Sequence, residues 1–454
     1  MDNILSLVAG VSGWLWSKPM LIIMVGGGII LTLRLGFFQI LYYPYILGQT
    51  FGSIFKGNRG QGTVPPFQAA TTALASTVGA SNIVGVPIAI AFGGPGAVFW
   101  MWMVSIIGCA TKFSEIVLGM KYREKNEDGQ YVGGPMYYLS KGLSNKSLGR
   151  FLAIMYTFFT MIIMFASVAA QTVSATHTVE VMGVSKSITG LLLTIFIAII
   201  AYGGITRIAN VTSKLVPVMA LIYIIGALIV ISANITQVPK VFSLIFSSAL
   251  NTSSAVGGVA GYSVAAAMRF GIARGTYSCE AGMGSAPMAH SAAATDHPVR
   301  QGFWGIFEIT VSSFIICTLS ALVVLTTGVW TEVAPSSAAI MPTLAFSSVL
   351  GAHLGGTIVS ISMLLFVIST LIVEVFYGEK QCEFLFGTKT AKFLKIFYIL
   401  AIPLGAMGGV EIIFGFLDII LAATILPNML GLILMSGQVS DLKKEFFSSS
   451  KYYN

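Results

Sequence analysis

Two stretches of the chain place glycines and hydroxyl residues inside long apolar surroundings. They are residues 75–82 (ASTVGASN) and residues 275–285 (GTYSCEAGMGS). Neither is suited to a continuous lipid-facing helix, because backbone that breaks at membrane depth needs protein or water to receive its free N–H and C=O groups. Such groups bind ions: helix N-termini suit a carboxylate, and unwound carbonyls and helix C-termini suit an ammonium or Na⁺. A zwitterion carries both charges.

Two adjacent hydroxyls form a third candidate site. Ser369 and Thr370 interrupt an apolar run that extends over residues 367–373. Hard cations such as Na⁺ favour oxygen ligands, but neighbouring helical residues point about 100° apart, so both hydroxyls contact one ion only if it lies between them. The alternative is that each hydroxyl bonds a carbonyl one turn back, a common habit of serine and threonine in helices.

Enzymatic and metal-binding motifs are not apparent. The four histidines lie at loops or helix ends without H-E-x-x-H spacing, and no Ser/His/Asp grouping is visible. The four cysteines form no C-x-x-C pair and lie in or beside apolar stretches, as expected of small residues in a helix bundle. We therefore expect no enzyme, and no cofactor beyond a coupling ion.

The composition requires lipid as the solvent. Hydrophobic residues make up 56% of the 454 residues and charged residues only 9%, whereas a soluble surface needs roughly a quarter of its residues charged. The net charge of +8 raises the question of nucleic acid. The basic residues, however, lie in short loops between apolar runs, so we expect a lipid bilayer and no nucleic acid as partner.

A membrane-spanning helix needs about 20 mainly apolar residues. The apolar runs predict an all-α polytopic membrane protein with about eleven transmembrane helices: 19–43, 65–92, 95–120, 151–176, 187–205, 215–235, 255–288, 302–327, 355–377, 393–406 and 410–435. The run 393–406 is short for a span. Residues 241–250 and 341–350 are too short and are expected on the outer surface, and residues 4–16 are expected to form an interfacial helix.

Loop charges orient these spans. Most lysines and arginines of the expected loops fall on one side, with Lys18, Lys186 and Lys240 on the other. Because basic loops are retained in the cytoplasm, the N-terminus is expected outside and the C-terminus inside.

The two broken spans open successive groups of five helices that enter the membrane from opposite sides, as in inverted-repeat transporters. This divides the chain into an N-terminal part with one extra helix (1–60), two five-helix repeats (61–240 and 241–440) and a cytoplasmic tail (441–454). The alternative is that glycines in these spans serve close helix packing.

At these segments the chain resembles the alanine or glycine:cation symporters. The resemblance is carried by residues 81–86 (SNIVGV), 93–102 (GGPGAVFWMW), 273–287 (ARGTYSCEAGMGSAP), 297–302 (HPVRQG), 377–379 (YGE) and 427–428 (PN). It implies a leucine-transporter-like fold of five plus five helices with one extra helix in front. It also implies sodium coupling and a prokaryotic plasma membrane. Where many relatives carry Asp-Thr, this chain has Ser312-Ser313, which weakens any cation role for that helix.

The resemblance and the break chemistry together assign candidate residues. Substrate contacts are expected from Gln68, Thr77, Gly79, Ala80, Ser81, Asn82, Gln171, Tyr277, Ser278 and Gly282. By similarity to the leucine-transporter pattern, Na⁺ would be held by Ala75, Val78, Asn82, Ser369 and Thr370.

Structural alternatives to these roles stay open. Asn82 can bridge two helices, Tyr277 can be an interfacial aromatic, and each glutamine can link helices instead of binding substrate. Among the charged residues, Lys112 and Glu115 are expected to pair with each other on one helix. Arg269 and Arg274 are expected to pair with carboxylates such as Glu280 or Glu308. Glu280 is also expected to accept backbone N–H groups of its own break.

These observations and the resemblance predict a secondary transporter, a monomeric sodium symporter for alanine or glycine that works by alternating access. Proton-coupled transport is the alternative, and a channel is a more remote one, because broken helices in inverted halves favour alternating access over a permanent pore.

Overall fold

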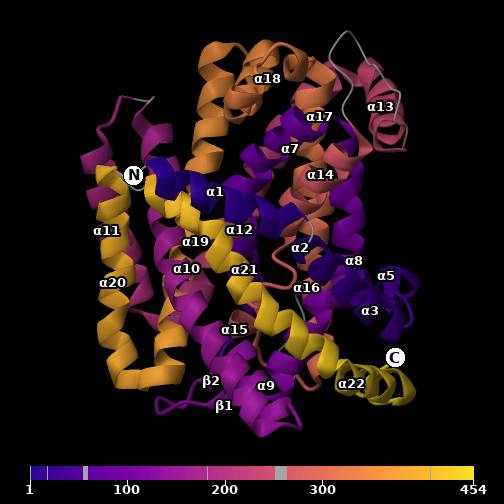
Figure 1. Ribbon diagram of the computed structural model, residues 1–454, viewed down its shortest axis with the longest axis vertical. Coiled ribbons are helices and arrows are strands. Elements are labelled where there is room, and N and C mark those ends of the chain that lie inside the picture. The colour runs from indigo at the N-terminus through magenta and orange to yellow at the C-terminus, as the bar shows by residue number, and fades with distance from the viewer. Residues whose placement is uncertain are drawn as a thin grey trace.

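The computed structural model describes residues 2–17, 19–54, 60–180, 183–250, 263–408 and 411–453, and these are almost entirely helical (Figure 1). The chain begins with α1 (Asp2–Ser17), α2 (Pro19–Leu21), a π-helical turn (Ile22–Gly26), α3 (Gly27–Arg34), α4 (Phe38–Leu41) and α5 (Tyr43–Phe51).

The next elements form the first group of long helices. They are α6 (Pro66–Thr77), a π-helical turn (Ser81–Gly85), α7 (Val86–Gly93), α8 (Gly96–Lys121), α9 (Pro135–Gly142), α10 (Lys146–Glu180), α11 (Lys186–Ala201) and α12 (Gly204–Ala233). A two-stranded antiparallel hairpin, β1 (Glu124–Lys125) with β2 (Tyr131–Val132), lies between α8 and α9.

The second group contains the other break. Its helices are α13 (Val238–Leu250), α14 (Val264–Cys279), α15 (Ala286–His290), α16 (Pro298–Ile309), a π-helical stretch (Thr310–Cys317), α17 (Thr318–Thr327), α18 (Met341–Leu350), α19 (Ala352–Phe386), α20 (Thr388–Met407), α21 (Glu411–Leu434) and α22 (Ser436–Ser448). Short 3₁₀ turns cover Ile235–Gln237, Val329–Thr331 and Pro335–Ile340.

Within the described residues, eight helices are long and apolar enough to span a membrane, or nine if the bent pair α6 and α7 is one span. The chain is thus a multi-pass membrane protein. The sequence-based count of eleven is not reached, because α11 has only 16 residues and α14 ends at the break. Residues 255–262 of the expected seventh span lie outside the described part of the chain.

Two span boundaries differ from expectation. The first apolar helical run extends over Gly10–Arg34 and not 19–43, so it includes much of the segment expected to be interfacial. α20 is a full 20-residue helix although its apolar run is short, because it continues through the flanking lysines toward Thr388.

Large apolar side chains point outward around the bundle. α11 and α12 expose Leu191, Leu192, Ile199, Leu221 and Ile225, each by more than half. An exposed apolar band of this size is expected for a surface that faces lipid. Figure 1 shows α13 and α18 together at one end of the bundle, and β1, β2 and α9 at the other.

Candidate functional site

The first break separates α6 from α7 by a bend of 51°. Val78 leaves the helix with φ −92° and ψ 86°. Gly79 N–H then donates to Asn82 Oδ1 over 3.1 Å, so the broken backbone is capped by a side chain three residues on. A Cβ at Gly79 would lie 3.1 Å from Thr370 Oγ1, and glycine therefore lets α19 approach the break closely.

Asn82 is fully buried and connects this break to the π-helical stretch Thr310–Cys317. Its Nδ2 donates to Ser312 O (3.3 Å) and to Cys317 Sγ (3.4 Å), and its own carbonyl accepts from Ser320 Oγ (2.8 Å). Asn82 thus bridges helices and also ends the break. The hydroxyls of Ser312 and Ser313 are buried, with no hydrogen-bond partner among the described residues.

The second break lies between α14 and α15. Glu280, Gly282 and Gly284 have φ of 51°, 94° and 73°. These left-handed conformations end the helix, and at the two glycines they cost little because no Cβ is present. As expected from the sequence, Tyr277 and Ser278 lie just before the break and Gly282 lies inside it.

Side chains from three other helices hold the second break. Asn428 of α21 donates to Gly282 O (2.9 Å), Tyr156 of α10 donates to Met283 O (3.1 Å), and Glu115 of α8 accepts from Gly284 N–H (3.0 Å). Asn428 also donates to Glu115 Oε1 (2.7 Å) and accepts from Tyr138. The Gly282 carbonyl, expected to face a substrate ammonium, is instead directed at Asn428.

The hydroxyl pair on α19 meets the first break. Ser369 Oγ and Thr370 Oγ1 both donate to Ala75 O over 3.2 Å. Each also donates to Phe366 O, over 2.8 and 2.9 Å. The hydroxyls thus bond back along their own helix, as one interpretation of the sequence expects, and they also converge on a carbonyl of α6. Val78, the second expected carbonyl, lies three residues beyond Ala75 in the break itself.

A buried lysine joins the two breaks. Lys112 of α8 donates to Thr77 Oγ1 (3.1 Å), at the end of α6, and to Cys279 O (3.0 Å), at the end of α14. It forms an ion pair with Glu308 (2.9 Å), and both side chains are completely buried. Its expected pairing with Glu115 is wrong, because Glu115 turns to the second break. One ammonium thus lies at the C-terminal ends of two half-helices, where helix dipoles favour positive charge.

Glu308 completes a buried chain of polar groups. It also contacts His290 Nε2, and His290 Nδ1 lies 2.7 Å from Gln301 Nε2. The expected pairing of Arg269 or Arg274 with Glu308 is therefore replaced by Lys112 and His290. The two arginines instead lie over aromatic rings, those of Phe270 and Tyr277.

Glu280 and Tyr277 have partners that the sequence did not predict. Glu280 accepts from Ser76 Oγ (3.3 Å) and Ser285 Oγ (2.6 Å), and so bonds side-chain hydroxyls where backbone N–H groups were expected. Tyr277 OH donates to Asp418 of α21 (2.7 Å). Asp418 also accepts from Ser12 and Trp16, so it anchors α1 to the last long helix.

The remaining predicted residues differ in their distance from the breaks. Gln171 of α10 reaches the first break, because its Nε2 lies 3.9 Å from a Cβ placed on Gly79. Ala80 and Ser81 lie in the break and are partly exposed, and Ser278 is buried beside the second break. Gln68 lies in the first turn of α6, ten residues and about 15 Å before the break. The structure does not bring Gln68 together with the others.

A large cavity opens beside the first break. Its volume is about 890 Å³, and Ile83, Val84, Val173 and Ser174 line it together with residues of α18 and the start of α19. On α10 its lining ends at Val173 and Ser174, two and three residues after Gln171. An amino acid fits such a volume easily.

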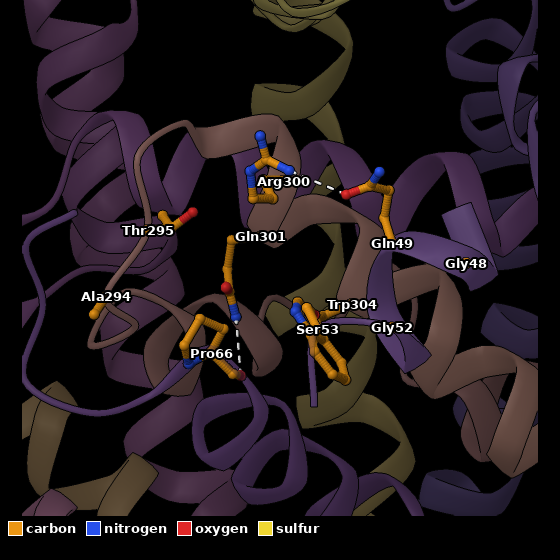
Figure 2. A pocket seen from close by; sticks show the side chains of 10 residues that line it. All are labelled: Gly48, Gln49, Gly52, Ser53, Pro66, Ala294, Thr295, Arg300, Gln301 and Trp304. Carbon is orange, nitrogen blue, oxygen red and sulfur yellow. Dashed lines mark hydrogen bonds between the residues drawn. The ribbon is translucent and has the colours of Figure 1, made fainter. Parts of the chain in front are cut away.

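A second pocket lies at the opposite end, beside the start of α6 (Figure 2). Arg300 donates to Gln49 Oε1 (3.1 Å) and Gln301 donates to Pro66 O (3.4 Å) across it. Its volume of about 80 Å³ is well below the roughly 300 Å³ from which ligand pockets usually start. We therefore place the candidate site at the breaks.

Both broken helices thus end at Lys112, and the hydroxyl pair of α19 lies against the first of them. The model of the sodium:alanine symporter family matches residues 1–453. The chain belongs to this family of transporters. It is 47% identical to the uncharacterized transporter YflA of Bacillus subtilis, over all of this chain and 96% of that protein. It is 38% identical to the sodium/alanine symporter AgcS of Methanococcus maripaludis, over 98% and 97% of the two chains.

The fold of this family member is also found among solved structures. The crystal structure of MhsT in complex with L-phenylalanine superposes with a TM-score of 0.59 over 83% of this chain and 89% of that one, at 15% identity. This confirms the leucine-transporter-like fold expected from the sequence.

Proposed function

We propose that this protein takes up a small neutral amino acid, alanine or glycine, together with Na⁺ by alternating access. The observation that carries the proposal is the convergence of Ser369 and Thr370 on the Ala75 carbonyl at the first break. Na⁺ would lie among these oxygens with the Val78 carbonyl. Asn82 would serve both ion and substrate.

The substrate would lie between the first break and α10. Amide groups of Gly79, Ala80 and Ser81 suit its carboxylate, and the Gln171 amide can donate or accept beside them. Carbonyls near Tyr277 and Ser278 suit its ammonium. The small residues of both breaks favour a small side chain, and the sodium/alanine symporter AgcS is a relative of nearly equal length.

We place the protein in a prokaryotic plasma membrane as a monomer, with the α18 end outside and the β-hairpin end in the cytoplasm. The basic residues Arg123, Lys141 and Lys392 at the hairpin end support this orientation. Two inverted repeats beginning at α6 and α14 are part of the same proposal.

Uptake of a panel of labelled amino acids into proteoliposomes tests the function. Alanine or glycine should accumulate only with an inward Na⁺ gradient. Accumulation that follows a pH gradient without Na⁺ would replace Na⁺ with the proton as coupling ion, and flux that does not saturate would indicate a channel.

A further inference from the structure

A buried carboxylate lies one helical turn beyond the hydroxyl pair on α19. Glu374 follows Thr370 by four residues, so the two side chains share one face of the helix. Glu374 is 8% exposed, and its Oε1 accepts from Ser167 Oγ of α10 over 2.5 Å. Its other oxygen, Oε2, is buried with no hydrogen-bond partner among the described residues.

Glu374 and Ser167 lie one helical turn from the candidate site, on the side of the β-hairpin. α10 starts at the α9 end of the molecule and α19 starts at the α18 end, so the two helices run in opposite directions (Figure 1). Gln171 and Thr370 meet around Gly79. One turn back on α10 is Ser167, and one turn forward on α19 is Glu374. Both steps lead toward the hairpin end, where Asn126 bonds Glu383 near the end of α19.

The groups around Glu374 do not neutralise it. Glu280 at the second break is itself a carboxylate, bonded to Ser76 and Ser285, and brings no positive charge. The lysines of neighbouring helices have other carboxylates: Lys112 pairs with Glu308, Lys395 with Glu379 and Lys380 with Glu383. Among the tyrosines of this region, Tyr156 donates to Met283 O and Tyr398 to Met161 O, and the buried Tyr377 hydroxyl has no hydrogen-bond partner among the described residues. In the described part of the chain, no cation pairs with Glu374.

A buried carboxylate without a counter-charge is costly, because transfer from water to a low-dielectric interior strongly disfavours the ion. The hydrogen bond from Ser167 to one carboxylate oxygen offsets only part of this cost. A small cation bound to the other oxygen removes the remaining cost. The position also suits such a cation, because an ion leaving the Ser369 and Thr370 level toward the hairpin end passes Glu374.

We propose that the Glu374 carboxylate binds a second monovalent cation, Na⁺ or a proton, that is carried in the same transport cycle. The inference rests on the proposed function, since it assumes coupled transport through this site. Na⁺ binds the carboxylate oxygen without a covalent bond and leaves it on the hairpin side, whereas a proton forms an O–H bond with this oxygen when the site loads and this bond breaks on release to the hairpin side. A zwitterionic substrate adds no charge, so each cation carried adds one elementary charge per amino acid.

The charge carried per alanine is the test, measured from the reversal potential of uptake in proteoliposomes. Glu374→Gln keeps the size of the side chain and an acceptor for Ser167 but loses the charge. We expect the ratio to fall by one elementary charge per alanine. Ser167→Ala removes the hydrogen bond but keeps the carboxylate, so it should retain the wild-type ratio. Glu374→Asp also keeps the charge and should retain this ratio.

Two gradients identify the ion. With equal Na⁺ on both sides, an imposed pH gradient shifts the wild-type reversal potential if the ion is a proton, and Glu374→Gln abolishes that shift. With equal pH, a Na⁺ gradient shifts the wild-type reversal potential by the full Nernst potential of Na⁺ if both cations are Na⁺, and by half of it if the Glu374 cation is a proton, whereas Glu374→Gln shows the full shift in both cases. An unchanged charge ratio in a folded, transporting Glu374→Gln protein overturns the proposal. Absence of Na⁺-driven uptake in the wild type would instead refute the proposed function.

Discussion

The two broken helices satisfy their freed backbone groups from different sources. In the first, residues 78–80 are capped by Asn82 from the same segment, and the neighbours are hydroxyls, an amide and a cavity of about 890 Å³. In the second, residues 280–285 are held by Glu115, Tyr156 and Asn428 from three distant helices. A locally capped break can exchange its partners for a ligand, whereas a break held by distant side chains is part of the scaffold. We therefore expect ligand binding to depend mainly on the first break and stability mainly on the second.

The largest effect on transport is expected from Asn82→Ala. This change removes the acceptor for Gly79 N–H and the donor to Ser312 O, so the first break loses its cap and its proposed ligand together. Alanine accumulation in proteoliposomes should be abolished or severely reduced at an equal amount of inserted protein. The exposed Asn210 on α12 gives a matched control, Asn210→Ala. Normal accumulation by Asn82→Ala would remove this residue from the site.

The largest effect on stability is expected from Lys112→Met. The substitution leaves Glu308 buried without its ion pair, a change that typically costs about 3–5 kcal/mol. Because Lys112 contacts the ends of α6 and α14, both breaks should loosen. Thermal unfolding in detergent measures the loss, with the exposed Lys240→Met as control. Adding Glu308→Gln should recover part of it, and an unchanged melting temperature in the single variant would show that the ammonium does not hold the breaks.

Gly79→Ala and Gly282→Ala distinguish the proposed binding role of the first break from the proposed structural role of the second. Gly282 has φ of 94°, so Gly282→Ala forces a conformation that costs about 1–3 kcal/mol. Gly79 needs no such conformation but lies against Thr370. Gly282→Ala should therefore lower the melting temperature, and Gly79→Ala should chiefly weaken alanine binding in calorimetric titrations. Equal loss of stability in both variants would contradict the comparison.

The smallest effect is expected at the hydroxyl pair. Ser369→Ala combined with Thr370→Val removes two proposed Na⁺ ligands while Ala75 and Val78 keep their carbonyls. The Na⁺ concentration for half-maximal uptake should rise several-fold, with substrate recognition at saturating Na⁺ less affected. Ser362→Ala, at another buried serine of α19, is the control. An unchanged Na⁺ dependence would exclude both residues.

The sequence predicted most of what depends on local pattern. Glycines and polar residues within apolar runs indicated both breaks, because a helix that is interrupted at membrane depth contains residues of these types. The first span was misplaced because apolar content extends from Gly10 without a clear boundary, and α20 appeared short because its lysines lie at one end of a continuous helix.

The partners of the charged residues could not be predicted in this way. Lys112 and Glu115 are one turn apart, which favours pairing on an isolated helix. In the folded chain each finds a partner from a distant helix, Glu308 and Asn428. Asp418 and Glu374 were missed for the same reason. A charged residue inside a span indicates function by itself, but its partner depends on how the helices pack.

The buried lysine has a consequence for biogenesis. A lysine near the centre of a spanning helix opposes insertion by about 2.5–3.5 kcal/mol, and α8 must carry Lys112 into the membrane early in synthesis. Its carboxylate partner Glu308 is 308 − 112 = 196 residues further along the chain, and the carbonyl to which it donates, at Cys279, is also made later. The ammonium therefore lacks its carboxylate partner while these 196 of the 454 residues are being made. Nascent chains stalled before α16 should be more readily degraded than those stalled after it.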